Sequence, residues 1–220
     1  MKYIFAPGCA LMIYKPHLAE KIYSLLNEQI APMNRLDICC QHYPSLAAGT
    51  QVINICPGCD RRYRNYNSAP GRATTISLWE VLAESSFFPF PNYHGQPMTI
   101  LDACPTRTQT QVHQSIRTLL RRMNIQLIEP AKTGTNGTCC GDSFWGTISP
   151  DQVKTKMIER AGEMPLNHVV VYCVSCTKSI YIGGKTPHYL LDLLFAEETP
   201  PKTYEPTDWH RELEEFIEKH

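Results

Sequence analysis

The sequence lacks a long hydrophobic run and an apolar leader before its first cysteine. No apolar stretch reaches the roughly 18 residues that a membrane-spanning helix requires. The apolar segment ahead of Gly8-Cys9 is far shorter than the h-region of a secretory signal, which has about 7–15 residues. These absences predict a cytoplasmic protein without a membrane span.

The sequence also lacks an excess of charge of either sign. It has 21 Lys and Arg residues and 21 Asp and Glu residues, so its formal net charge is zero. A nucleic-acid-binding protein needs a clustered basic surface. The one basic run, at residues 61–64, instead predicts a solvated helix face or a docking patch near the cysteines. We therefore expect no nucleic-acid partner.

Motifs of several common enzyme classes are missing as well. No Gly-rich phosphate loop, Ser-His-Asp order or paired-carboxylate motif rises above background. What the sequence does contain is ten cysteines in 220 residues. Because disulfides are rare in the cytoplasm, these cysteines are better explained as metal ligands or catalytic thiols.

The cysteines form two copies of one pattern. Each copy has a single cysteine, then an adjacent pair, then a Cys-x-x-Cys, an order that chance would rarely produce twice. This indicates an internal duplication. The two sets are Cys9, Cys39, Cys40, Cys56 and Cys59, followed by Cys104, Cys139, Cys140, Cys173 and Cys176.

Short runs rich in β-branched residues precede the cysteines and predict buried parallel strands. They lie at 3–5, 52–55, 99–101 and 169–172. Amphipathic segments between and after them predict helices at 17–27, 77–82, 109–123, 151–162 and 189–194. Ser77 and Thr186-Pro187 are plausible start signals for two of these helices. Alternating strands and helices predict an α/β fold of two duplicated βα units with small parallel sheets.

We predict two cysteine-rich domains, at residues 1–90 and 97–196, joined by a Pro-rich connection. A tail follows at 197–220, with a charged helix at 208–219. Its apolar stripe of Trp209, Leu213, Phe216 and Ile217 either packs on its own domain or docks a partner, and the first interpretation is favoured.

The cysteine loops should meet at the carboxyl ends of the parallel strands, which is the usual place for a site in such sheets. Adjacent cysteines cannot easily form a disulfide with each other, but both can bind a multinuclear centre. Five thiolates exceed the four of a tetrahedral zinc site. The C-x2-C-x2-C spacing of a ferredoxin is absent. The pattern therefore favours an iron–sulfur cluster in each half.

Zinc bound by four of the five cysteines is the main alternative. It is stronger for the first half, where the gap before Cys56 is short and His42 offers another ligand. Asp102 and Asp142 could relay protons, although capping and turn roles are favoured. Arg107, Lys178 and Lys185 could attract an anionic thiol substrate, or be solvated charges.

The pattern resembles the paired cysteine-rich CCG domains of heterodisulfide reductase, in the component that splits the disulfide. The same domain occurs in iron–sulfur subunits of glycolate and lactate oxidation systems and in a class of succinate dehydrogenases. The resemblance covers residues 1–195 and includes the opening Met1-Lys2-Tyr3, Gly8-Cys9 and the tripeptide Cys139-Cys140-Gly141. Gln41 departs from it, because the family has glycine after its cysteine pair.

The resemblance implies that each set of five cysteines holds a non-cubane [4Fe–4S] cluster. It further implies an oxidoreductase subunit that reduces a small disulfide or related sulfur substrate. Because the chain has no ferredoxin-type motif, an iron–sulfur or flavin subunit must then donate the electrons. Two alternatives stay open: an electron-relay or maturation subunit of a larger dehydrogenase, and a zinc-stabilised scaffold.

Overall fold

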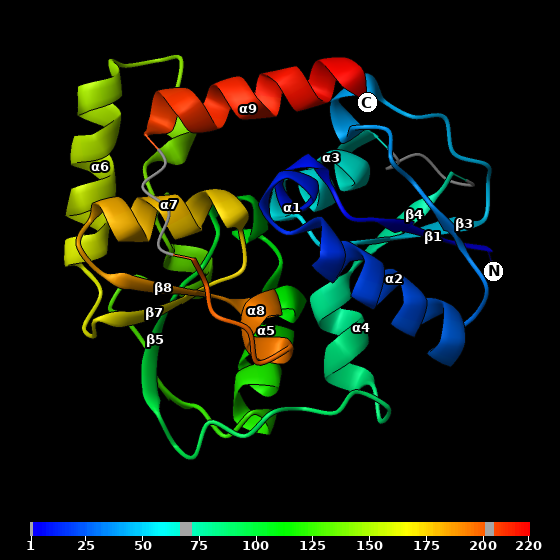
Figure 1. The fold of residues 1–220 in the computed structure, drawn as a ribbon, viewed down its shortest axis with the longest axis horizontal. Helices are drawn as coiled ribbons and strands as arrows, with labels where there is room; N and C mark the ends of the chain where they lie inside the picture. The colour runs from blue at the N-terminus through cyan, green and yellow to red at the C-terminus, as the bar shows by residue number, and fades with distance from the viewer. Residues whose placement is uncertain (1, 67–71, 201–204) are drawn as a thin grey trace. The chain divides into compact units, whose positions relative to one another are not determined.

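The computed structural model describes residues 2–66, 72–200 and 205–220 (Figure 1). The chain divides into two compact units. The first comprises residues 1–87 with 211–220, and the second comprises residues 88–210. The residues predicted as a separate tail are thus shared between the two units. None of the described helices is long and apolar enough to cross a membrane.

The first unit is built on a four-stranded parallel sheet in the order β2-β1-β3-β4. Its central strands are buried, as expected for a parallel sheet covered on both faces: Phe5, Val52 and Ile53 are almost fully inaccessible. The strands are β1 Lys2–Ala6, β2 Asn34–Arg35, β3 Thr50–Asn54 and β4 Thr74–Ser77.

The helices of the first unit pack their apolar residues inward. Leu18, Ile22 and Leu26 of the second helix are fully buried. Ser77 caps the fourth helix in a capping box with Glu80, which confirms it as a helix start. The helices are α1 Cys9–Tyr14, α2 Pro16–Gln29, α3 Pro57–Tyr66 and α4 Leu78–Glu84, with a 3₁₀ turn, η1, at Cys40–His42.

The second unit repeats the same sheet, in the order β6-β5-β7-β8, again with all strands parallel. Figure 1 shows β5, β7 and β8 side by side. Its elements are β5 Pro97–Leu101, β6 Gln126–Ile128, β7 His168–Val171, β8 Thr186–Tyr189, α5 Thr110–Arg122, α6 Pro150–Gly162, α7 Val174–Ile182 and α8 Leu190–Leu194. Short 3₁₀ turns are η2 Cys104–Thr106, η3 Gly134–Asn136 and η4 Asp142–Phe144.

The matching strand order of the two units confirms the predicted α/β fold with duplicated parallel sheets. One local prediction is wrong. Thr186-Pro187 does not begin a helix but lies in β8, and α8 begins at Leu190. Proline is tolerated there because β8 is at the edge of its sheet.

Helix α9, Pro206–Lys219, contributes its residues up to His210 to the second unit and those from Arg211 to the first. Its apolar stripe is covered within the chain. Trp209 is buried, and Leu213, Phe216 and Ile217 are half-buried. In the first unit, Ile217 packs against a buried cluster that includes Cys39, Cys40 and Cys59.

Candidate metal centres

Each cysteine lies just after a parallel strand or in the turn that leads into the next helix. In the first unit, Cys9 begins α1 after β1, and Cys56 and Cys59 lie at the start of α3 after β3. Cys40 begins η1, and Cys39 precedes it. Since the carboxyl ends of parallel strands share one edge of the sheet, these loops meet there.

The five sulfurs of the first unit form a continuous network of hydrogen bonds. The Cys9 and Cys40 thiols donate to Cys39. The Cys59 thiol in turn donates to Cys40 and to Cys56. All five predicted ligands of the first half are therefore brought together.

The second unit repeats this network link by link. The Cys104 and Cys140 thiols donate to Cys139. The Cys176 thiol donates to Cys140 and to Cys173. The duplication seen in the sequence thus extends to the hydrogen bonds between sulfurs, because equivalent cysteines are linked in both units.

These hydrogen bonds give neighbouring cysteines different pKa values. Hydrogen bonds from Cys40 and then Cys9 lower the pKa of Cys39 to about 2. A hydrogen bond from Cys59, helped by the backbone amides of Cys59 and Gly58, lowers the pKa of Cys56 to about 7. The pKa of Cys9 is instead raised, because its thiol donates to Cys39 and is buried.

Mutual repulsion opposes the ionisation of the whole set, since charge on Cys39, Cys40 or Cys56 raises the pKa of Cys9. Burial adds to this effect. The five thiols therefore resist ionising together, and a positive metal centre would relieve that repulsion.

The backbone lies close to the sulfurs in both units. Gly8 has a φ of +77°, and a Cβ on it would lie 3.1 Å from Cys56 Cβ and 3.3 Å from Cys59 Sγ. In the second unit, the Gly141 amide donates to Cys139 Sγ at 3.3 Å. Amide donors to sulfur are the usual means by which a protein tunes a cluster.

Among the described residues, no group of three or more His, Cys, Asp or Glu side chains is arranged to hold a metal ion. His42 is also engaged elsewhere, because its Nε2 lies 2.8 Å from the Ile217 carbonyl oxygen. One ring nitrogen of His42 is thus already engaged by a backbone carbonyl.

A buried charged group adjoins the second set. Lys178, whose side chain is 1% exposed, pairs with Asp142, directly after the Cys139-Cys140-Gly141 tripeptide. His210 Nε2 lies 3.1 Å from the same Asp142 oxygen, and its ring stacks on Trp145 at 4.5 Å. Lys178 is therefore neither a solvated charge nor an open anion-binding group.

Residues at the start of α9 also lie close to the second set of cysteines and to Lys178. Trp209 Nε1 donates to Ser175 Oγ at 3.0 Å, inside the Cys173–Cys176 turn, and Lys178 Nζ lies 5.6 Å from the Trp209 ring centre. Sequence reasoning missed this arrangement. Its only signal was the apolar stripe on the helix at 208–219.

Asp102 organises the loop that carries Cys104. Its carboxylate accepts both Arg117 Nη groups at 2.7 Å, the Gly134 amide at 2.6 Å and the Tyr172 hydroxyl at 3.2 Å. Burial would raise the pKa of Asp102, but the Arg117 hydrogen bonds and charge overcome it and lower the pKa to about 2. The carboxylate thus stays ionised and holds the loop that carries Cys104.

The two other cations considered from sequence also hold loops. Arg107 Nε donates to the Gly137 carbonyl at 3.3 Å. Lys185 Nζ donates to the carbonyls of Met164 and Leu166 at 3.0 and 2.9 Å. Both therefore have structural partners.

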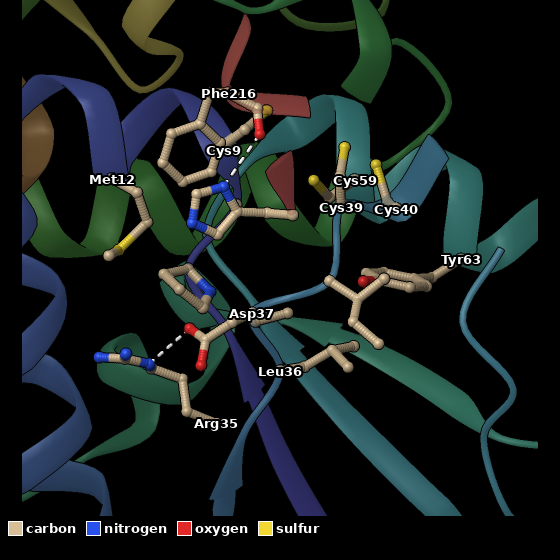
Figure 2. Close-up of a pocket in the computed structure, with 15 residues that line it drawn as sticks. Cys9, Met12, Arg35, Leu36, Asp37, Cys39, Cys40, Cys59, Tyr63 and Phe216 are labelled. Atoms are coloured by element: carbon tan, nitrogen blue, oxygen red, sulfur yellow. Dashed lines mark hydrogen bonds and ion pairs between the residues drawn. The ribbon is translucent and has the colours of Figure 1, made fainter. Parts of the chain in front are cut away.

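Cavities adjoin both sets of sulfurs, to different extents. In the first unit, a cavity of about 270 Å³ touches four of the five cysteines (Figure 2). In the second, a cavity of about 180 Å³ touches only Cys139 among them.

Together these features define a duplicated α/β protein with a five-thiol site at the strand ends of each unit. No model of a known protein family matches the sequence. No curated protein is significantly similar to it either.

Proposed function

We propose that this protein is an iron–sulfur redox subunit that reduces a disulfide or related sulfur substrate. In this proposal each set of five cysteines holds one non-cubane [4Fe–4S] cluster. The observation that carries it is the convergence of five thiols, linked in the same order, at the strand ends of both units.

The number and chemistry of the donors support a cluster over zinc. A tetrahedral zinc ion uses four thiolates and leaves a fifth buried sulfur without a role. A multinuclear centre gives each sulfur an iron to bind and supplies the positive charge that the crowded thiolates need. Amides such as that of Gly141 would then donate to the bound sulfurs and help set the reduction potential.

When bound, the clusters would supply electrons one at a time, and two such electrons, with two protons from water, would convert a disulfide into two thiols. The role of the chain is to bind the substrate, exclude water and hold the sulfurs in place. An iron–sulfur or flavin subunit would donate the electrons. A cytoplasmic location suits this assignment, because its reducing conditions keep free thiols reduced.

The first test is the metal content of protein purified without oxygen. We expect about eight irons per chain, an equal amount of acid-labile sulfide and a brown absorbance that bleaches in air. Zinc without iron would contradict the proposal and favour the scaffold alternative.

The second test is catalysis by the loaded protein. With reduced viologen as the electron donor, we expect a small disulfide to be converted to two thiols. Protein that carries both clusters but shows no turnover with any disulfide would instead be an electron-relay or maturation subunit.

A further inference from the structure

The two adjacent cysteine pairs have different hydrogen-bond donors around them, and this difference bears on the reduction potentials of the proposed clusters. In the second unit, Ser143 Oγ lies 2.8 Å from Cys139 Sγ. A cysteine bound to a metal is a thiolate without a proton, so the serine hydroxyl is then the donor of this hydrogen bond. The inference rests on the proposed function, because it concerns the cluster that Cys139 would hold.

A tight turn brings three donors of this loop to one sulfur. Gly141 has a φ of +107°, and its amide donates to Cys139 Sγ at 3.3 Å. The Ser143 amide donates to the same sulfur. The Phe144 amide closes the turn on the Gly141 carbonyl at 3.2 Å. Backbone amides that converge in this way favour negative charge, and the Ser143 hydroxyl adds a third donor.

The residue between the two amide donors is held by contacts within the second unit. Asp142 pairs with Lys178, whose side chain is buried, and His210 Nε2 lies 3.1 Å from the same carboxylate oxygen. Since Asp142 is fixed on this side, the turn keeps the neighbouring Ser143 beside the sulfur.

The first unit has no serine at the matching position. Cys39 is the sulfur equivalent to Cys139. The hydrogen bonds that lower its pKa come from Cys40, Cys9 and the Gln41 amide, and none of these donors is a hydroxyl. Four residues after Cys39 the chain has a tyrosine, where four residues after Cys139 it has Ser143.

We propose that Ser143 is a positioning residue of the second unit, whose hydroxyl donates to Cys139 Sγ and raises the reduction potential of the cluster held there. Reduction adds one electron, which comes from the iron–sulfur or flavin donor, and part of its charge falls on the sulfur ligands. A hydrogen bond to such a sulfur stabilises the reduced state more than the oxidised state. Because the first unit has no matching serine, this contribution belongs to the second cluster alone.

A redox titration of the full-length protein loaded with iron tests this role. The reduced fraction is followed by visible absorbance, and Cys39→Ser, which removes a ligand of the first cluster, identifies the step that belongs to the second. We expect Ser143→Ala to keep about eight irons per chain. At a fixed potential it should lower the ratio of reduced to oxidised second cluster by about threefold or more, without moving the step of the first cluster.

Two further variants separate the hydroxyl from the fold of the turn. Ser143→Thr keeps a hydroxyl and should restore the ratio of the unmodified protein. Ser45→Ala removes an exposed hydroxyl from the loop that follows the first cysteine pair, and it should move neither step. A purely structural role of Ser143 would change the iron content rather than the potential.

A vibrational spectrum provides a second readout of the same hydrogen bond. In heavy water the hydroxyl exchanges its proton for deuterium, so the iron–sulfur stretching bands of the second cluster should shift in the resonance Raman spectrum. We expect this shift to be smaller in Ser143→Ala than in the unmodified protein and to return in Ser143→Thr.

The outcomes distinguish this inference from the proposed function. An unchanged potential in Ser143→Ala, with its iron retained, would overturn the inference and leave the proposed function intact. Loss of the second cluster in that variant would also overturn it, because the hydroxyl would then be needed for binding the cluster. Unmodified protein without iron would instead contradict the proposed function itself.

Discussion

At the scale of single residues, the cysteines within each unit differ in pKa. The same differences occur in both units. Hydrogen bonds from neighbouring thiols lower the pKa of Cys39 in the first half and of Cys139 in the second. The pKa of Cys9 and of Cys104 is raised, because each donates such a bond. The same sulfur contacts thus recur in both units.

Two features favour glycine at position 141: its backbone conformation and the atoms packed close to it. Its φ is +107°, and a Cβ on it would lie 2.7 Å from Met157 Cγ and 2.8 Å from the Met157 nitrogen. We expect Gly141→Ala to lower the free energy of unfolding by about 2 kcal/mol or more and to reduce iron binding in the second unit. Urea unfolding and iron assay measure both effects.

Gly146→Ala is the matched control for that substitution. Gly146 also has a positive φ, +78°, but its Cβ would meet nothing within 4 Å. It should therefore show the backbone cost alone, about 1 kcal/mol, with normal iron content. Equal losses of stability in the two variants would refute the steric argument.

His188 makes the stability of the second unit depend on pH. Burial, and then the nearby His168, lower the pKa of His188 to about 4, from about 6.5 in an unfolded chain. The unfolded state therefore binds more protons below pH 6.5. The stability that neutral His188 supports is complete above that pH and is lost as the pH falls towards 4.

We expect His188→Gln to reduce the loss of unfolding free energy between pH 7 and pH 4 by about 2 kcal/mol. Urea unfolding at the two pH values measures it, with the exposed His17→Gln as the control substitution. An NMR titration midpoint of His188 near 6.5 would contradict the prediction.

At the scale of elements, a buried ion pair joins three segments around the second set of cysteines. Lys178 belongs to α7, Asp142 begins η4, and His210 of α9 contacts the same carboxylate. Breaking a buried pair leaves an uncompensated charge, whereas replacing both partners does not. We therefore expect Lys178→Met to lower the free energy of unfolding by about 3 kcal/mol.

The double variant Lys178→Met with Asp142→Asn should recover most of that loss, as measured by urea unfolding. If the double variant is as unstable as the sum of the single variants, Lys178 and Asp142 are not coupled, and the assignment of a stabilising buried ion pair is wrong.

Element types were predictable where the pattern is local. The β-branched runs before the cysteines predicted β1, β3, β5 and β7, and periodicity predicted the longer helices. The edge strands β2 and β6 have only two and three residues, too few to show an alternation. The helix start predicted at Thr186-Pro187 was wrong because proline is tolerated both at a helix start and in an edge strand.

The surroundings of the sites were less predictable than the cysteines themselves. The two sets could be read from their repeated order alone. The burial of Lys178 depends on Asp142, 36 residues earlier in the sequence, and on Trp209 of α9. Such long-range packing leaves no periodic signal in the sequence. The burial of Lys178 therefore could not be predicted.

At the scale of the whole molecule, the duplication bears on the proposed clusters: if each unit holds one, as we propose, each should load independently of the other. Each sheet supplies its own loops, and the sulfur network of each unit closes on its own five members. We therefore expect Cys139→Ser to lower the iron content from about eight to about four per chain, and Cys39→Ser to remove the other half.

Electron paramagnetic resonance of the two variants would then show two different single-centre spectra that together reproduce the spectrum of the unmodified protein. The double variant should bind almost no iron. If either single substitution removed all the iron, the sulfurs of both units would have to serve one shared centre. The five-cysteine assignment within each unit would then be wrong.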